Sequence, residues 1–297
     1  MGKLTRWRTK DLIMKMLLTV LMAEVMSGRS KFHPLFVAAA LVWFALPCSG
    51  ALIFNPGDTT KSENFDGLGT SGAAFPVAGV PFVAWDTDVT DAVIITMTTD
   101  TGSGTGGGVR NVGVAGVNAL TDRALGSLGS GSVIPAFGLN IQNNTGGAIG
   151  GFTISYRSEH WRSGDNAGTE VWNFQYAIVS SEISMDTSAA TWIDLDALDM
   201  TELNPTLIVA AARDGNASGN FATVSGSLAV TLNAGEFIAF RWLDANSAGA
   251  DAIMAVDDFT ITAVPEPTTW AGLIFGAIFC GTQVVRRLRN RPAAQNS

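Results

Sequence analysis

Cysteine and histidine are scarce in this chain, with 2 of each among 297 residues. Cys48 and Cys280 lie near the two ends, so neither disulfides nor a thiolate metal site can hold the central region together. His160 is the one histidine of that region, which excludes a zinc site made of several histidines. A lone histidine at the end of a strand is usually structural.

Basic residues are also scarce between residues 51 and 263. This region has 7 Lys and Arg against 23 Asp and Glu, a net charge of about −16, although the net charge of the whole chain is −8. Such a surface repels nucleic acid and anionic polymers. It suits solubility outside the cell or cation binding, and we expect no nucleic-acid partner.

Helical periodicity and hydrolase motifs are absent from the same region. No G-x-S-x-G occurs, so a nucleophile-elbow hydrolase has no support. Gly102, Gly104 and Gly107 satisfy G-x-G-x-x-G, but no helix follows to bind a phosphate. We interpret this glycine-rich segment as a flexible loop.

Apolar residues instead recur at every second position, in short runs bounded by Gly, Asn, Asp and Ser. The clearest runs are Phe137–Ile141, Phe152–Tyr156, Trp172–Ile178, Leu228–Leu232 and Ile238–Trp242. This alternation is typical of half-buried antiparallel strands joined by tight turns. The pattern predicts an all-β fold, an antiparallel β-sandwich that is jelly-roll-like, as a single domain over 52–263. In the run from Trp172, we expect Trp172, Phe174 and Tyr176 to face the core.

The N-terminal end has the three parts of a secretory signal peptide. Residues 26–34 are basic, 35–46 are apolar, and Ser49-Gly50-Ala51 offers small residues for cleavage. We therefore expect a signal peptide over 26–51, handled by the Sec translocon and signal peptidase. Residues 1–25 are interpreted as an upstream extension, because Met26 would start a normal leader. A lipoprotein is disfavoured, since Pro47 precedes Cys48.

The C-terminal end, 264–297, combines three features in a fixed order. Val264-Pro265-Glu266-Pro267 is a rigid turn that should end the last strand, because the prolines lack N–H donors. The apolar run 270–285 would give roughly 24 Å of transmembrane helix, enough to cross a bilayer with some thinning. An arginine cluster follows, which should remain cytoplasmic. It comprises Arg286, Arg287, Arg289 and Arg291.

This order resembles the PEP-CTERM sorting signal of bacterial surface proteins. The resemblance implies an exosortase, a membrane-embedded cysteine protease, as a partner that recognises Pro-Glu-Pro and removes the helix. It also implies export, transient anchoring in the inner membrane, and delivery to the cell surface or extracellular matrix. An ordinary C-terminal anchor after a proline linker is the alternative.

Several central segments resemble a sandwich domain that is common in PEP-CTERM surface proteins. They are 122–131, 159–162, 241–244 and 255–259, and the last also resembles the closing strand of MAM and laminin-G-like jelly rolls. The resemblance implies a binding or structural module without known chemistry.

Two sets of residues are candidates for a site. Glu159, Arg162 and Trp161 would form either an ion pair beside the indole or a platform for a sugar. Glu63 and Asp66 near the first strand, with Asp257 and Asp258 in the last, would share a structural calcium ion, because Ca²⁺ takes six to eight oxygen ligands. The alternative for the aspartates is hydrogen bonding to turn amides. The loops that start at Asp214 and Asp244 also have oxygen ligands, but a turn explains each better.

Two classes of function remain open from the sequence. The first is a non-enzymatic surface or matrix protein that binds extracellular polysaccharide, with no cofactor except the candidate calcium. The second is a secreted hydrolase of carbohydrate, which needs two carboxyl groups about 5 to 10 Å apart. Sequence alone does not place such a pair across a cleft.

Overall fold

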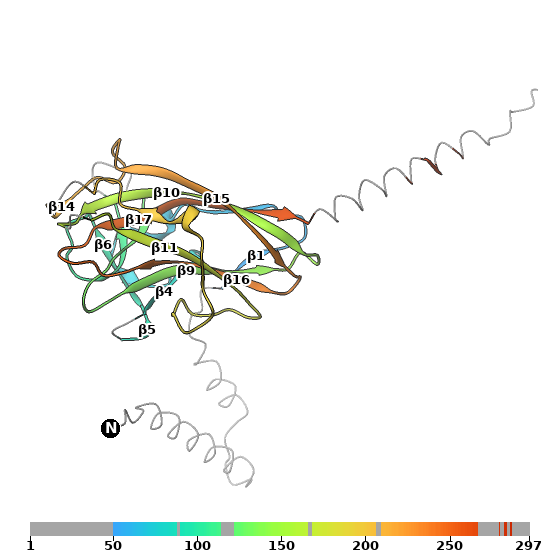
Figure 1. The fold of residues 1–297 in the computed structure, drawn as a ribbon, viewed down its shortest axis with the longest axis horizontal. Helices are drawn as coiled ribbons and strands as arrows, with labels where there is room; N and C mark the ends of the chain where they lie inside the picture. The colour runs from blue at the N-terminus through green and yellow to red at the C-terminus, as the bar shows by residue number, and fades with distance from the viewer. Residues whose placement is uncertain are drawn as a thin grey trace, which may run out of the picture. The chain divides into compact units, whose positions relative to one another are not determined.

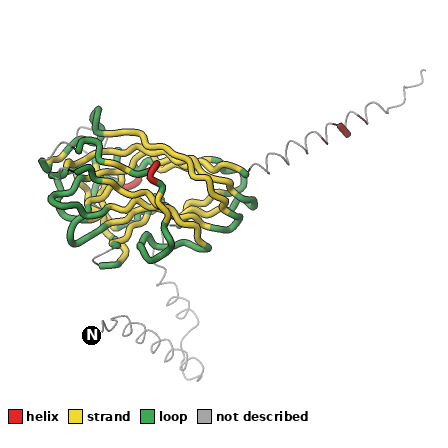
Figure 2. The backbone as a smooth tube through the Cα atoms, in the orientation of Figure 1, coloured by secondary structure: helices red, strands yellow, loops and turns green. Residues whose placement is uncertain are grey.

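The computed structural model describes residues 50–87, 90–113, 122–165, 168–205 and 209–266, together with Phe279, Thr282, Gln283 and Arg286. From 50 to 266, its regular structure consists of strands and two single-turn 3-10 helices, η1 (Asp66–Leu68) and η2 (Asp196–Leu198). The strands form two layers, visible as the upper and lower ribbons of Figure 1 and as the yellow segments of Figure 2. The predicted all-β sandwich of two sheets is confirmed.

The first sheet has eight described strands and runs in the order β12-β11-β16-β9-β4-β5, with β1 on β9 and β13 on β11. Its strands are β1 (Leu52–Phe54), β4 (Val83–Asp86), β5 (Ala92–Val93), β9 (Pro135–Asn143), β11 (Val171–Val179), β12 (Ile193–Asp194), β13 (Met200–Thr201) and β16 (Phe237–Asp244).

The second sheet has nine described strands and runs in the order β14-β10-β17-β8-β7-β6-β3, with β15 on β10 and β2 on β17. Its strands are β2 (Thr60–Glu63), β3 (Ala73–Ala74), β6 (Thr96–Asp100), β7 (Gly108–Val112), β8 (Ala124–Leu128), β10 (Ile149–Ser163), β14 (Ala211–Ala212), β15 (Phe221–Leu232) and β17 (Ile253–Pro265).

Strand pairing is mostly antiparallel, as predicted, but two pairs are parallel, which the sequence did not predict. β1 runs parallel to β9, and β6 runs parallel to β7. Parallel neighbours need a connection that carries the chain back to the starting end. Between β6 and β7, the glycine-rich segment 102–107 makes that return.

An aromatic cluster fills the space between the sheets, with Trp242 of β16 at its centre. Its indole ring contacts five rings with centroids 4.9–6.3 Å away. From the first sheet and the segment before β4 come Phe82, Phe137 and Phe174, and from the second sheet come Tyr156 and Phe259. Trp242 therefore joins the two layers, and all six residues are buried.

The alternation predicted for β11 holds over most of its length. Trp172 and Phe174 are fully buried, and Tyr176 packs against the same core while partly buried. The prediction fails at Ile178, which is 42% exposed, whereas its neighbour Ala177 is buried. Part of the outer face of this sheet is also covered, because Asn140 and Arg241 donate hydrogen bonds to the carbonyls of Ile183 and Met185.

The last strand extends beyond the predicted end of the domain. β17 continues through Val264 to Pro265, which pairs with Ile149 of β10, so Val264 and Pro265 do not form a turn that ends the strand. A proline is tolerated here because its missing N–H lies at the end of the ladder.

The predicted targeting segments fall mainly outside the described residues. These include the upstream extension, the signal peptide up to residue 49, Pro267, Arg287 and Arg289. Phe279, Thr282, Gln283 and Arg286 are described and helical. Among the described residues, no helix is long and apolar enough to cross a membrane.

The buried position of Phe174 allows a test of the core. Replacing Phe174 by Ala should lower the free energy of unfolding by about 3–5 kcal/mol, because the ring leaves a cavity beside Trp242. Denaturant titration measures the change. Asn173→Ala on the same strand, where the side chain is exposed, is the control and should change stability little. Equal stabilities for Phe174→Ala and wild type would show that the assigned register of β11 is wrong.

Candidate functional site

A β-bulge in β17 positions the two aspartates of the Ala255–Phe259 segment. Thr260 pairs with Ser155 and Asp257 with Arg157, so β17 has one more residue than β10 between these pairs. Asp258 takes up the bulge with a φ of 48°, a left-handed conformation that aspartate tolerates better than most residues. Because of this extra residue, Val256 and Phe259 both face the core, while Asp258 is exposed.

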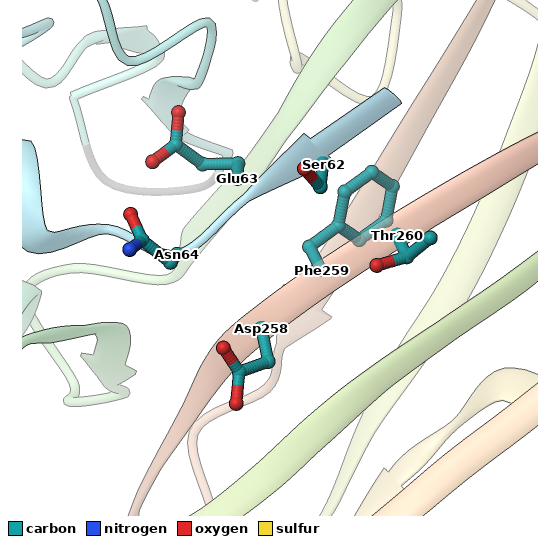
Figure 3. A pocket seen from close by; sticks show the side chains of 6 residues that line it. All are labelled: Ser62, Glu63, Asn64, Asp258, Phe259 and Thr260. Atoms are coloured by element: carbon teal, nitrogen blue, oxygen red, sulfur yellow. The ribbon is translucent and has the colours of Figure 1, made fainter. Parts of the chain in front are cut away.

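An open groove lies where β2 meets this bulge, and it is the principal candidate site. It has a volume of about 420 Å³ and is lined by Ser62, Glu63, Asn64, Asp258, Phe259 and Thr260 (Figure 3). Pairing of Glu63 with Phe259 and of Ser62 with Thr260 brings these segments together. The lining side chains are hydroxyls, an amide and two carboxyls around a buried phenyl ring. Sequence analysis identified Glu63 and Asp258 but not Ser62, Asn64 or Thr260.

The four predicted calcium ligands come near this groove but do not converge on one point. Glu63 and Asp258 line it, and their carboxyl groups point in different directions in Figure 3. Asp66 lies in η1, where it accepts a hydrogen bond from Asn64 at 2.8 Å. Asp257 accepts one from the amide of Asp258 at 2.7 Å. In the described part of the chain, no group of three or more His, Cys, Asp or Glu side chains is arranged to hold a metal ion.

Glu63 also has a structural bond within its own segment. Its Oε1 accepts a hydrogen bond from the amide of Phe65 at 2.8 Å. Burial raises the pKa of the Glu63 carboxyl above its ordinary value. Calcium binding at these residues remains a prediction, with Glu63 and Asp258 as the two carboxyl groups that reach the groove.

The other predicted set does not form one exposed surface. Trp161 is fully buried, and its ring lies under Gly215, where an added Cβ would come within 2.4 Å of the indole. The Trp161 Nε1 donates to Glu159 Oε2 at 2.9 Å. Glu159 pairs with Arg157 at 3.0 Å instead of with Arg162. The expected Glu159–Arg162 ion pair is therefore wrong, because Arg157 takes its place and Arg162, beyond a register shift in β10, lines a different cavity.

Glu159 and Asp257 are two buried carboxyl groups on neighbouring strands. Burial raises the pKa of Glu159 to about 7 despite the attraction of Arg157. Burial, and then the charge of Glu159, raises the pKa of Asp257 to about 8. Two neighbouring carboxyl groups with raised pKa values are typical of an acid-base site. Here, however, Glu159 and Asp257 are 1% and 5% exposed, so neither presents its carboxyl group to a substrate.

Arg162 lies in a second, smaller cavity at the glycine-rich end of the sandwich. This cavity of about 120 Å³ is lined by Arg162 and Asp251 together with Thr105, Leu128, Gly129, Ser130, Gly131, Asn246, Gly249 and Ala250. Asp251 is 4% exposed, and its buried Oδ2 has no hydrogen-bond partner. Of the three residues predicted around Trp161, only Arg162 thus reaches a described cavity.

His160 is fully buried, and its Nε2 lies 2.7 Å from the carbonyl oxygen of Arg162. Burial lowers its pKa to about 4. These contacts agree with a structural role for this histidine.

No protein-family profile and no curated protein matches this chain. Solved structures that resemble it are distant. The K3 cleaved adhesin domain of Lys-gingipain from Porphyromonas gingivalis is 17% identical, with a TM-score of 0.31 over 68% of this chain and 90% of that one. The CBM22-1 xylan-binding domain from Paenibacillus barcinonensis Xyn10C is 12% identical, with a TM-score of 0.31 over 72% and 99%.

A family 11 carbohydrate-binding module from Clostridium thermocellum, solved with a mixed-linked tetrasaccharide, is 10% identical. Its TM-score is 0.30, and the match covers 70% of this chain and 98% of that one. At this distance, inferences about function depend on the residues of this chain.

The raised pKa of Asp257 makes stability depend on pH. A carboxyl group whose folded pKa lies above its ordinary value stabilises the fold at low pH, and this contribution is lost as pH rises through the folded pKa. For Asp257 the window runs from 3.8 to about 8. We expect Asp257→Asn to melt at a higher temperature than wild type at about pH 9 and to differ little at about pH 4. Asp196→Asn, at an exposed residue of η2, is the control. Parallel melting profiles for wild type and Asp257→Asn across this range would contradict the assignment.

Proposed function

We propose that this chain is an exported, non-enzymatic protein of the cell surface or extracellular matrix whose β-sandwich binds extracellular polysaccharide. The observation that carries the proposal is the open groove between β2 and β17. Its hydroxyl, amide and carboxyl side chains are the groups that exchange hydrogen bonds with sugar hydroxyls. Its volume of about 420 Å³ lies in the range of small-molecule sites.

The acidic balance of the domain narrows the choice of polysaccharide. With 23 acidic against 7 basic residues between 51 and 263, the domain repels polyanions at moderate ionic strength. Glu63 and Asp258 accept hydrogen bonds, so they favour the hydroxyl groups of an uncharged sugar over a uronic acid.

A carbohydrate hydrolase is the second candidate, and one observation favours it. Glu63 and Asp258 are two carboxyl groups in one groove, and burial raises the pKa of Glu63, as a general acid requires. Against it, Glu63 is held by the amide of Phe65, and the two carboxyl groups do not face each other in Figure 3. We therefore favour binding over catalysis.

We further propose that the chain is sorted by its C-terminal segment. Val264, Pro265, Glu266 and Pro267 would be recognised by an exosortase-type protease after export through the Sec translocon and removal of the leader by signal peptidase. β17 ends at Pro265, so the recognised peptide would begin within the last two residues of the strand and continue beyond the sheet.

The binding proposal predicts that the full chain is retained by an uncharged polysaccharide such as cellulose, xylan or chitin. The triple variant Glu63→Gln, Asn64→Ala, Asp258→Asn should bind at least about tenfold more weakly, since it alters three groove side chains. Depletion from solution measures binding, and repeating it with EDTA tests the predicted calcium. Release of reducing sugars by wild type but not by Glu63→Gln would instead establish the hydrolase. If wild type binds no polysaccharide, the proposed binding function is wrong.

The sorting proposal predicts cleavage near Pro267. Mass spectrometry of the surface-exposed protein should find peptides up to that region and none from beyond Ile274. Replacing Arg286, Arg287, Arg289 and Arg291 by Ala should let the helix pass into the periplasm, because the positive charges that stop transfer are gone. Replacing the same four by Lys keeps the charge and serves as the control. Peptides from the apolar run in mature surface material would contradict cleavage.

A further inference from the structure

Hydroxyl side chains form two aligned rows across four strands of the second sheet. The rows follow from the register of β2, β17, β10 and β15, which lie side by side in that order. The first row is Thr60, Thr262, Thr153 and Ser227, and the second is Ser62, Thr260, Ser155 and Ser225. We call these eight residues the hydroxyl face. β10, β15 and β17 lie together in the upper layer of Figure 1.

The hydroxyl face is open to solvent and carries no charge. Five of its residues are exposed and Thr260, Thr262 and Ser155 are partly buried. The Thr60 and Thr262 hydroxyls lie 3.0 Å apart, so these two neighbours in the first row are in contact. Charged side chains border the face at Arg157, which pairs with Thr223, and at Glu63 and Asp258, which line the groove beside the second row.

An exposed sheet face needs polar side chains for solubility, and charged residues meet that need as well as hydroxyls do. In a domain with 23 acidic residues, none lies in either row. The face is therefore the neutral part of an acidic surface. It offers hydrogen bonds without the cost of stripping water from a charge.

The dimensions of the face match an extended chain of sugars. Neighbouring strands are about 4.8 Å apart and side chains on one face recur about every 6.8 Å, so the rows span about 14 Å and are separated by about 7 Å. Each hydroxyl both donates and accepts a hydrogen bond. A glycan lying along the rows would find hydrogen-bond donors and acceptors along both of its edges.

The face is continuous with the groove of the proposed binding site. Ser62 and Thr260 belong to the second row and also line the groove. A ligand that enters the groove would therefore continue over the neighbouring hydroxyls of β10 and β15.

We propose that the hydroxyl face is a platform for an uncharged, extended polysaccharide, which lies across the four strands with one end in the groove. This inference rests on the proposed binding function. It specifies that the ligand is a neutral polymer and that the ligand contacts the sheet face. Recognition depends on several neutral hydrogen bonds in a flat array. Binding is consequently insensitive to salt, unlike attraction between charges.

The test compares two fourfold variants of the full chain on cellulose, xylan, chitin and anionic alginate. The test variant is Thr153→Val, Thr262→Val, Ser155→Ala and Ser225→Ala, which removes hydroxyls from both rows and leaves the groove side chains unchanged. Valine keeps the shape and strand preference of threonine, so the fold is retained. The control variant is Thr191→Val, Thr201→Val, Ser180→Ala and Ser181→Ala, which removes four exposed hydroxyls in or next to the first sheet. Melting curves verify that both variants fold.

We expect wild type and control to bind an uncharged polysaccharide equally well, and the test variant to bind at least about tenfold more weakly. Wild-type affinity should not change between about 50 and 500 mM NaCl, because the ligand is uncharged. If the test variant binds like wild type while the groove variant does not, the platform is wrong and the proposed function stands. A preference for alginate, loss of binding in salt, or a wild-type dimer that the test variant abolishes would also overturn the platform. If wild type binds none of the four, both proposals fail.

Discussion

The contact of Trp242 with rings from both sheets is the interaction on which the rest of the sandwich depends. Within the region 50–266 the described regular structure is strand and two single-turn helices, so stability has to come from packing between layers. Phe137 and Phe174 flank the indole from its own sheet, and Tyr156 and Phe259 meet it edge-on from the other. Such aromatic pairs add about 0.5–1.5 kcal/mol each beyond the burial of their area. The register of β10, β16 and β17 is fixed because a shift by one residue would turn these rings to solvent.

This packing requirement also accounts for the geometry of the groove. Phe259 can reach Trp242 while Val256 remains in the core only if β17 contains one additional residue between them. The bulge places Asp258 outward at a positive φ, beside Glu63 of β2. The outward position of Asp258 in the groove is thus a consequence of how the aromatic core is filled.

The sequence predicted the all-β class and most of the core, because period-two alternation depends on local burial alone. The alternation failed at Ile178. This side chain is exposed and the neighbouring Ala177 is buried, an exchange that the sequence pattern does not reveal. The sequence identified Glu63 and Asp258 but predicted an ion pair of Glu159 with Arg162, whereas Arg157 is the partner. The Ser and Thr residues at every second position of β2, β10, β15 and β17 are visible in the sequence. Their alignment into rows is not, because it depends on which strands are neighbours and in what register.

Both the groove and the hydroxyl face require β2 to lie on β17, which joins residues 202 apart in the chain, as in the Thr60–Thr262 contact. β2 has only four residues, and four pairs hold it to β17. We expect this contact between β2 and the last strand to form late in folding, because closing so long a loop costs chain entropy that the core must first offset. The proposed binding surface therefore exists only once β17 is in place. Since β17 includes Val264 and Pro265, the strand that completes the surface also contains the start of the proposed sorting signal. If both proposals hold, the binding face and the sorting signal share one element of the fold.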